Sequence, residues 1–122
     1  MKKYEIYQIN LTNEMVEEVN SSQDALPEWY AKYTRTTFKP TVENVTDAID
    51  MYKHVSNITS DLGLEHVFEI GNIGPENNIE RFAPMHSLSI GDVVVDREYR
   101  RASVVASVGF EEVPYQLFQE IA

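Results

Sequence analysis

Side chains suited to acid–base or metal chemistry recur at helical spacing between residues 43 and 54. The row consists of Glu43, Asp47, Asp50 and His54. If the segment is helical, all four lie on one face, and carboxylates with an imidazole are ligands for divalent metals. A straight helix presents its ligands along a line, however, and neither an HExxH nor an ExxH pattern is present. We therefore expect a solvated acidic face and no bound metal.

The second candidate is an aromatic and basic stretch over residues 29–39. It holds three basic residues and no acidic one, in a chain whose formal net charge is −10. Tryptophan, tyrosine and arginine are enriched in protein interfaces, and the same mixture forms stacking platforms for single-stranded nucleic acid. Because the overall charge repels phosphate, a protein partner is favoured. The candidate contact residues are Trp29, Tyr30, Lys32, Arg35 and Lys39. The alternative is that Trp29, Tyr33 and Phe38 are core residues and only the charges are exposed.

The third candidate is a cluster of three arginines, Arg97, Arg100 and Arg101, in a segment expected to form a hairpin tip. Arginines in a turn can grip a phosphate or a carboxylate. Asp96 and Glu98 lie beside them and would neutralise part of their charge. A solvated loop is the alternative.

No catalytic pattern accompanies the histidines, which are widely spaced along the chain. Neither the GxSxG turn of serine hydrolases nor a phosphate-binding loop with its lysine is present. We assign no catalytic residue, metal site or cofactor, and an enzyme is not favoured. The arrangement that would revise this view is convergence of His86, Asp92 and Arg101 on a cleft.

The first third of the chain predicts one strand and two helical segments. Residues 3–9 alternate apolar and polar side chains with bulky groups on both faces, which is typical of an internal strand. Residues 13–20 carry an apolar edge and follow a capping threonine, so we expect a short helix. Residues 27–33 predict a helical turn, and the threonines in 34–38 favour extended chain.

The clearest helix signal begins at Thr41 and fades after about residue 57. Its apolar stripe consists of Val45, Ala48, Ile49, Tyr52 and Val55. Residues 65–70 predict a strand, and the glycines and proline of 71–75 predict a turn.

The last part of the chain predicts a β-hairpin. Its strands are residues 93–95 and 102–108, joined by a polar turn over 96–101, and residues 113–121 predict a short helix. Helices early and strands late favour an α+β fold with a small antiparallel or mixed sheet of four to five strands and two or three helices. The length of 122 residues fits a single domain, 1–122.

Composition narrows the setting. The chain has no cysteine, which excludes disulfides and thiolate chemistry and fits a reducing compartment. It has no apolar run long enough to span a membrane, and acidic and amide residues interrupt the N-terminal segment, so we expect a cytoplasmic protein without membrane contact. The acidic balance argues against nucleic-acid binding, and a homo-oligomer is left open.

One segment resembles a known family. The run from Met85 to Val95, with Ser89-Ile90-Gly91-Asp92 at its centre, is followed after a hairpin by Gly109-Phe110. It resembles the YodL-like domains of bacterial and phage-borne mobile-element proteins over residues 84–114. The resemblance implies a phage or mobile element in a bacterial cytoplasm, and it carries over no catalytic residue. In physical terms, Gly91 permits a tight turn, Asp92 can close that turn by bonding to backbone, and the apolar residues Leu88, Ile90, Val93, Val95 and Phe110 are expected in the core.

Three functional hypotheses follow. The first is a non-enzymatic accessory protein of a phage or mobile element that binds another protein through residues 29–39 or the acidic face. The second is an acidic mimic of nucleic acid that inhibits a host DNA- or RNA-handling protein through Glu43, Asp47 and Asp50. The third is a small enzyme or a relative of RNA-binding barrels of the PUA and ASCH type, which share serine-flanked Gly-Asp-Val turns but have the basic face that this chain lacks.

Overall fold

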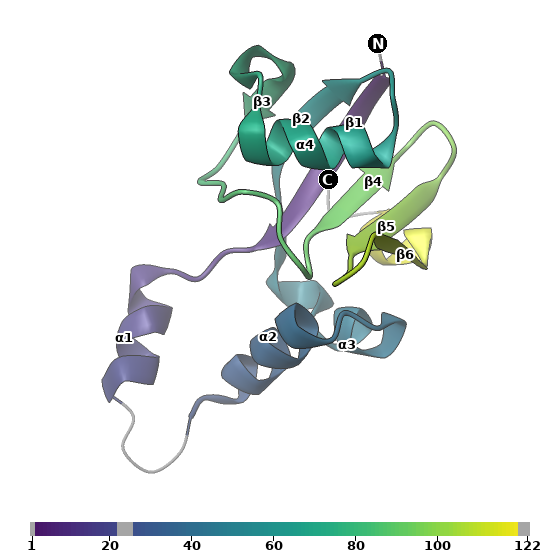
Figure 1. The fold of residues 1–122 in the computed structure, drawn as a ribbon. Coiled ribbons are helices and arrows are strands. Elements are labelled where there is room, and N and C mark those ends of the chain that lie inside the picture. The colour runs from purple at the N-terminus through teal and green to yellow at the C-terminus, as the bar shows by residue number, and fades with distance from the viewer. Residues whose placement is uncertain (1, 22–25, 120–122) are drawn as a thin grey trace.

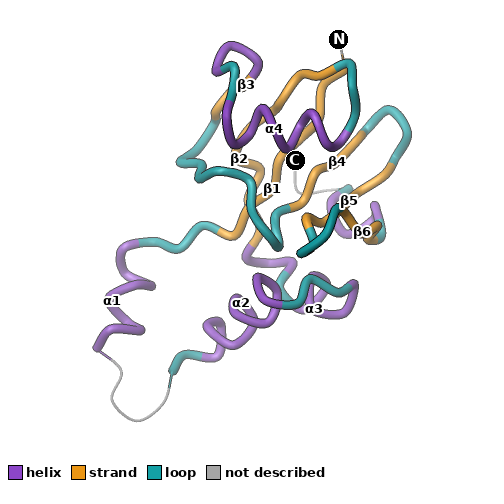
Figure 2. Tube along the Cα trace, viewed as in Figure 1, coloured by secondary structure: helices purple, strands orange, loops and turns teal. Residues whose placement is uncertain are grey.

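A computed structural model describes residues 2–21 and 26–119. Within them the chain forms an α+β fold of four α-helices and six strands, with three short 3-10 helices (Figure 1, Figure 2). The elements in chain order are β1 (Lys2–Ile9), α1 (Asn13–Ser21), α2 (Glu28–Phe38), α3 (Val42–Asp47), η1 (Ile49–Met51), β2 (Tyr52–Ser60), α4 (Leu64–Ile73), η2 (Glu76–Asn78), β3 (Ile79–Arg81), β4 (Val93–Asp96), β5 (Arg101–Val105), β6 (Phe110–Val113) and η3 (Tyr115–Phe118).

The strands form one sheet in the order β3-β2-β1-β4-β5-β6. Every neighbouring pair is antiparallel. The first strand therefore lies inside the sheet, between β2 and β4, which confirms the internal strand expected over residues 3–9. Its register with β2 shifts between Ile6 and Tyr7, so that a bulge interrupts the ladder at the centre of β1.

Apolar clusters cover both faces of the sheet. On one face, Val67 and Ile70 of α4 pack with Tyr4 and Ile6 of β1, and Figure 1 shows α4 lying across that face. On the other face, the segment from α3 to η1 packs with the C-terminal η3, whose Phe118 is fully buried. A central strand covered on both faces shows little polar alternation.

The structure corrects the helix expected from Thr41 to about residue 57. The helix α3 ends at Asp47, and β2 begins at Tyr52. Because β2 is covered on both faces, its apolar residues do not alternate cleanly, and some of them extend the 3.6-residue stripe of α3 by coincidence. Its β-branched residues, such as Val55 and Ile58, are the signal that favoured a strand.

The strand expected over residues 65–70 is also wrong, since this segment lies within the helix α4. Leu64, Val67, Phe68 and Gly71 recur at i, i+3, i+4 and i+7, which is a helical stripe. A window of six residues is too short to separate that period from alternation.

The extended chain expected over residues 34–38 is wrong as well, because α2 continues to Phe38. Its threonine hydroxyls donate to backbone carbonyls one turn earlier: Thr34 to Tyr30 at 2.9 Å, and Thr36 to Lys32 at 2.8 Å. Back-bonding of this kind lets a helix accommodate residues with high strand propensity.

The predicted C-terminal hairpin is confirmed as β4 and β5, with the turn over residues 97–100, but β5 ends at Val105 instead of continuing to residue 108. Strands β2, β3 and β6 were not predicted, whereas the strand predicted over 65–70 is helical. The sheet therefore has six strands rather than four or five, and the described helices number four rather than two or three. Of the helix expected over 113–121, the structure shows the 3-10 turn η3, and residues 120–122 lie outside the described part. No helix in the described ranges is long and apolar enough to cross a membrane.

Candidate functional site

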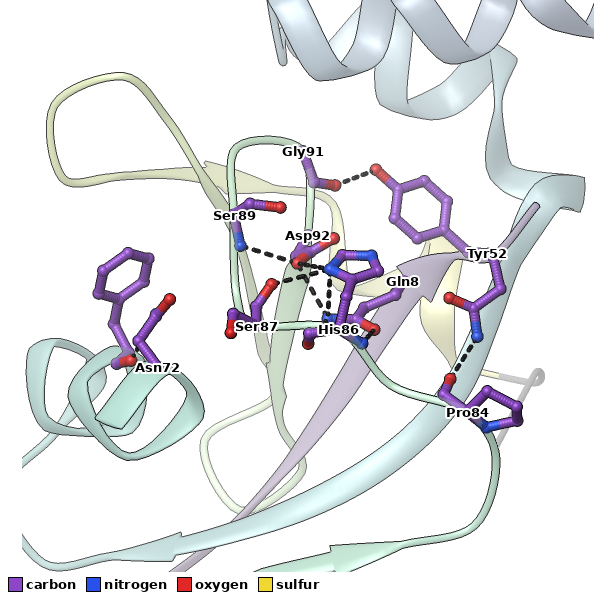
Figure 3. Close-up of polar contacts among 11 residues, drawn as sticks. Gln8, Tyr52, Asn72, Pro84, His86, Ser87, Ser89, Gly91 and Asp92 are labelled. Atoms are coloured by element: carbon purple, nitrogen blue, oxygen red, sulfur yellow. Dashed lines mark hydrogen bonds and ion pairs between the residues drawn. The ribbon is translucent and has the colours of Figure 1, made fainter. Parts of the chain in front are cut away.

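A buried polar cluster joins the end of β1 to the loop that precedes β4 (Figure 3). Gln8 is fully buried, and its amide nitrogen donates to the carbonyl oxygen of His86 at 2.9 Å and to Oδ2 of Asp92 at 3.0 Å. Its amide oxygen accepts from the backbone N–H of His86 at 3.3 Å. Both ends of one side chain therefore hold the loop, and the cluster combines an amide, an imidazole and a carboxylate.

The loop is shaped by a turn that the sequence predicted. Asp92 accepts the backbone N–H of Ser89 at 2.9 Å, and Gly91 has a φ of +98°. A Cβ at Gly91 would lie 3.2 Å from the carbonyl oxygen of Thr36 in α2. The phenol of Tyr52 donates to the carbonyl oxygen of Gly91. Gly91 therefore meets two demands, a left-handed backbone and a close approach of α2.

The Nδ1 atom of His86 has two polar neighbours within hydrogen-bonding distance. It lies 2.8 Å from the carbonyl oxygen of Ser87 and 3.3 Å from the amide nitrogen of Gln8. Nδ1 donates to the carbonyl oxygen when it carries a proton and accepts from Gln8 when it does not. Nδ1 also lies 3.8 Å from Oδ2 of Asp92, an ion pair whenever the ring is charged.

Burial raises the pKa of Asp92 to about 6, since only 4% of the residue is exposed. Desolvation disfavours the carboxylate. The backbone N–H of Ser89, the charge of His86 and the amide of Gln8 act in the opposite direction but do not outweigh it. A carboxyl that titrates near neutral pH beside a histidine is a feature common at functional sites and also found in structural networks.

A pocket of about 520 Å³ opens beside this cluster. Apolar side chains from two segments, Ile9 with Leu11 and Met85, form part of its lining, and Lys53 and His86 add nitrogen-bearing groups. The two segments that line the pocket are joined by a hydrogen bond, in which the side chain of Asn10 donates to the carbonyl oxygen of Pro84 at 2.5 Å. The bond is drawn in Figure 3 beside the labelled Pro84.

Of the three residues whose convergence would indicate a cleft, the structure brings two together. His86 and Asp92 meet, whereas Arg101 lines a different pocket with Asp96 and Tyr99. The sequence did not predict Gln8 as a member of the cluster or Lys53 as part of the pocket lining. Gln8 lies 78 positions from His86 in the chain, and only the strand order, which puts β1 beside β4, brings them into contact.

The acidic row does not form one helix face. Glu43 and Asp47 are exposed on α3, Asp50 is exposed in η1, and His54 lies on β2 with its ring stacked on Tyr7 at 5.0 Å. Across residues 2–21 and 26–119, no three His, Asp or Glu side chains gather as a metal site requires.

The aromatic–basic stretch lies on α2. Trp29, Tyr30 and Lys32 are partly buried, and the ring of Trp29 contacts that of Tyr30 edge-on at 5.9 Å. Arg35 and Lys39 are exposed. Phe38, which one alternative placed in the core, is 90% exposed at the end of the helix.

The arginines of the hairpin tip are not equivalent. Arg100 and Arg101 are exposed. Arg97 turns back onto the protein: its Nε donates to Oε1 of Glu5 at 2.9 Å, and its Nη2 donates to the hydroxyl of Tyr7 and to the carbonyl oxygen of Phe118, both at 2.8 Å. Its Nη1 donates to the hydroxyl of Tyr115 at 3.1 Å. Arg97 therefore fastens η3 to β1.

The Arg97 contacts also set the pKa of Glu5. Burial alone would raise it, but hydrogen bonds from Arg97 and Tyr7 and the guanidinium charge hold the pKa of Glu5 below its usual value.

Comparison with known proteins adds no relative: no protein-family model, curated protein or solved structure matches this chain.

Proposed function

We propose that this chain is a non-enzymatic accessory protein of a phage or mobile element that acts in the bacterial cytoplasm by binding another protein. The observation that carries the binding role is an exposed apolar surface at the end of α2. The mobile-element setting rests on the resemblance of residues 84–114, which contain the hairpin of β4 and β5.

The Phe38 surface, as we name it, consists of Phe38, Val42 and Val108 with the residues between them. Phe38 is 90% exposed and Val108 89% exposed. They belong to neighbouring segments, because Phe38 and Ser107 line the same shallow depression with Thr41. Single exposed apolar side chains are common, but apolar side chains from three adjoining segments mark an interaction site more often than bare surface.

Charge suggests the chemistry of the partner. Arg35 lines a hollow with Phe38, and Lys39 lines the depression that Phe38 shares with Ser107; both basic residues are exposed. Glu111, which is also exposed, lines the same depression as Lys39. Because the two basic residues outnumber it, the surroundings of the aromatic anchor favour a partner with an apolar pocket bordered mainly by carboxylates. Because the rest of the chain is strongly acidic, such a partner is oriented by the local positive charge.

Photo-crosslinking followed by a binding measurement tests this function. A photoreactive residue at position 38 or 108 should capture a host or phage protein that the same residue at position 73 does not. Ile73 is a matched control, since it is 83% exposed at the end of α4. With the captured protein purified, Phe38→Ser should weaken binding by about tenfold or more, as the loss of an aromatic anchor does.

The matched variant Ile73→Ser should leave that affinity unchanged. Both variants should unfold within about 0.5 kcal/mol of the parent chain, because the replaced side chains are exposed. Equal capture from positions 38, 108 and 73, or an affinity that Phe38→Ser leaves unaltered, would contradict the proposal.

The acidic-mimic hypothesis has less support. A continuous row of carboxylates was its basis, and that row ends with α3 at Asp47. Binding that collapses as salt rises and depends on Glu43 rather than Phe38 would favour the mimic instead.

A further inference from the structure

We propose that the pocket beside His86 binds a small ligand with an anionic head group on an apolar body. The pocket, of about 520 Å³, falls in the size range of small-molecule sites, roughly 300–1,000 Å³. This site is separate from the Phe38 surface, because the two have no lining residue in common.

The lining of the pocket has the composition that such a ligand needs. Ile9, Leu11 and Met85 offer apolar contact for the body of a ligand. Lys53 and His86 offer nitrogen groups for its head, and none of the described residues that line the pocket is acidic. A local patch without carboxylates is notable in a chain with a net charge of −10, since an anion is otherwise repelled.

The two nitrogen-bearing side chains are placed by one buried residue. Gln8 is the cross-strand neighbour of Lys53, so their side chains leave the same face of the sheet. Gln8 also holds the backbone of His86 through both its amide nitrogen and its amide oxygen. Gln8 therefore links the strand position opposite Lys53 to the backbone of His86, and both residues line the same pocket.

In His86, Nδ1 contacts the protein, and we assign Nε2 to the ligand. Nδ1 is engaged by the carbonyl oxygen of Ser87, with Oδ2 of Asp92 at 3.8 Å. The side chain is 48% exposed and lines the pocket, and we infer that Nε2 is the atom that meets the ligand. A protonated ring donates from Nε2 to an anionic oxygen.

The charges that face this histidine are few. Asp92 lies behind the ring and is 4% exposed, and Lys53 forms no ion pair with any residue of the described ranges 2–21 and 26–119. An anionic head group would give Lys53 that partner.

Titration of isotope-labelled protein with chosen probes tests the site. Phenyl phosphate and hexanoate carry both parts of the proposed ligand, whereas inorganic phosphate and phenol each carry one. We expect phenyl phosphate or hexanoate to shift the amide signals of Leu11, Met85 and His86 saturably, with a dissociation constant tighter than about 10 mM. Inorganic phosphate and phenol should bind at least tenfold more weakly.

Two variants that each remove one positive charge distinguish binding in the pocket from nonspecific electrostatic attraction of an anion to the protein. Lys53→Met should weaken the better probe at least fivefold, and Lys3→Met, which removes an exposed lysine at the other end of β1, should not. The proposal is overturned if neither amphiphilic probe saturates below about 10 mM, if inorganic phosphate binds as well as phenyl phosphate, or if both lysine variants weaken binding equally. Well-dispersed spectra of each variant show that the fold is intact.

Discussion

The polar clusters around Arg97 and His86, which both contact β1, differ in whether a polar side chain remains exposed to bind a ligand. Around Arg97, the guanidinium Nε, Nη1 and Nη2 each donate to a group of the protein. Around His86, the amide of Gln8 bonds to the backbone and the carbonyl oxygen of Ser87 contacts Nδ1, while 48% of the side chain stays exposed beside a pocket. The first cluster fastens chain segments together, and the second holds a half-exposed imidazole beside a pocket.

A charged residue in a loop is therefore not always free to bind a ligand or a partner. Sequence reasoning treated Arg97 as a surface group with Arg100 and Arg101, but Arg97 is directed inward by Glu5 of the distant β1. The sequence predicted no role for His86 by itself, yet His86 lines a pocket. In both cases the contacts of the side chain depend on the pairing of β1 with β4, which brings Glu5 close to Arg97 and Gln8 close to His86.

The largest expected effect is on the stability that Arg97 supplies. Arg97→Met leaves Glu5, whose side chain is 17% exposed, as a carboxylate without its cation. Because removing one partner of a largely buried ion pair is costly, we expect a loss of about 2–4 kcal/mol in the free energy of unfolding. Urea denaturation at pH 7 measures it.

The same turn supplies the control. Arg100→Met removes an exposed arginine whose guanidinium carbon lies 5.7 Å from the centre of the Tyr115 ring, so the loss should stay below about 1 kcal/mol. Similar losses in the two variants would mean that the Arg97 contacts add no stability beyond those of a surface arginine.

The second prediction concerns pH, where the two clusters act with opposite sign. Glu5 has a lowered pKa, so its contribution is present above its usual pKa and is lost as pH falls through the lowered value. Asp92 has a pKa raised from 3.8 to about 6. The folded protein therefore binds this proton more tightly, and the contribution of Asp92 to stability is largest below pH 4 and declines as pH rises to about 6.

Asp92→Asn isolates that second contribution. An asparagine side chain can still accept from the N–H of Ser89, but it does not titrate. The difference in unfolding free energy between parent and variant should change by about 2–3 kcal/mol from pH 4 to pH 6.5, in the direction that favours the variant at the higher pH. Taking the difference cancels Glu5 and the other carboxylates. A difference that stays constant across this range would show that Asp92 titrates normally.

Local features of the sequence predicted the hairpin and its turn because the responsible residues are close in the chain. Ser89, Gly91 and Asp92 close the turn among themselves, and Val93 and Val95 are buried as expected. The helix and strand assigned to residues 41–57 and 65–70 failed for the opposite reason. Whether a strand is covered on both faces depends on the sheet order, which no short window contains.

In the candidate site, too, local features could be predicted from the sequence and long-range contacts could not. Asp92 could be predicted as a turn residue, whereas its contacts with Gln8 and His86 require β1 to lie beside β4. Gln8 carries a weak signal in retrospect. A glutamine near the end of an internal strand, among Ile6, Tyr7 and Ile9, must find hydrogen-bond partners when it is buried.

The smallest expected effect separates the two parts of the Arg97 cluster. Tyr115→Phe removes the hydroxyl that accepts from Nη1 of Arg97 at 3.1 Å but keeps the ring, which lies 5.4 Å from the guanidinium carbon. Because Tyr115 is partly exposed, water replaces some of the lost bond, and the expected loss is about 0.5–1 kcal/mol. Tyr99→Phe is the control, since Tyr99 is 67% exposed and should change stability by less than about 0.5 kcal/mol. If Tyr115→Phe were as harmful as Arg97→Met, the anchoring of η3 rather than the pairing of Glu5 would be the main role of the cluster.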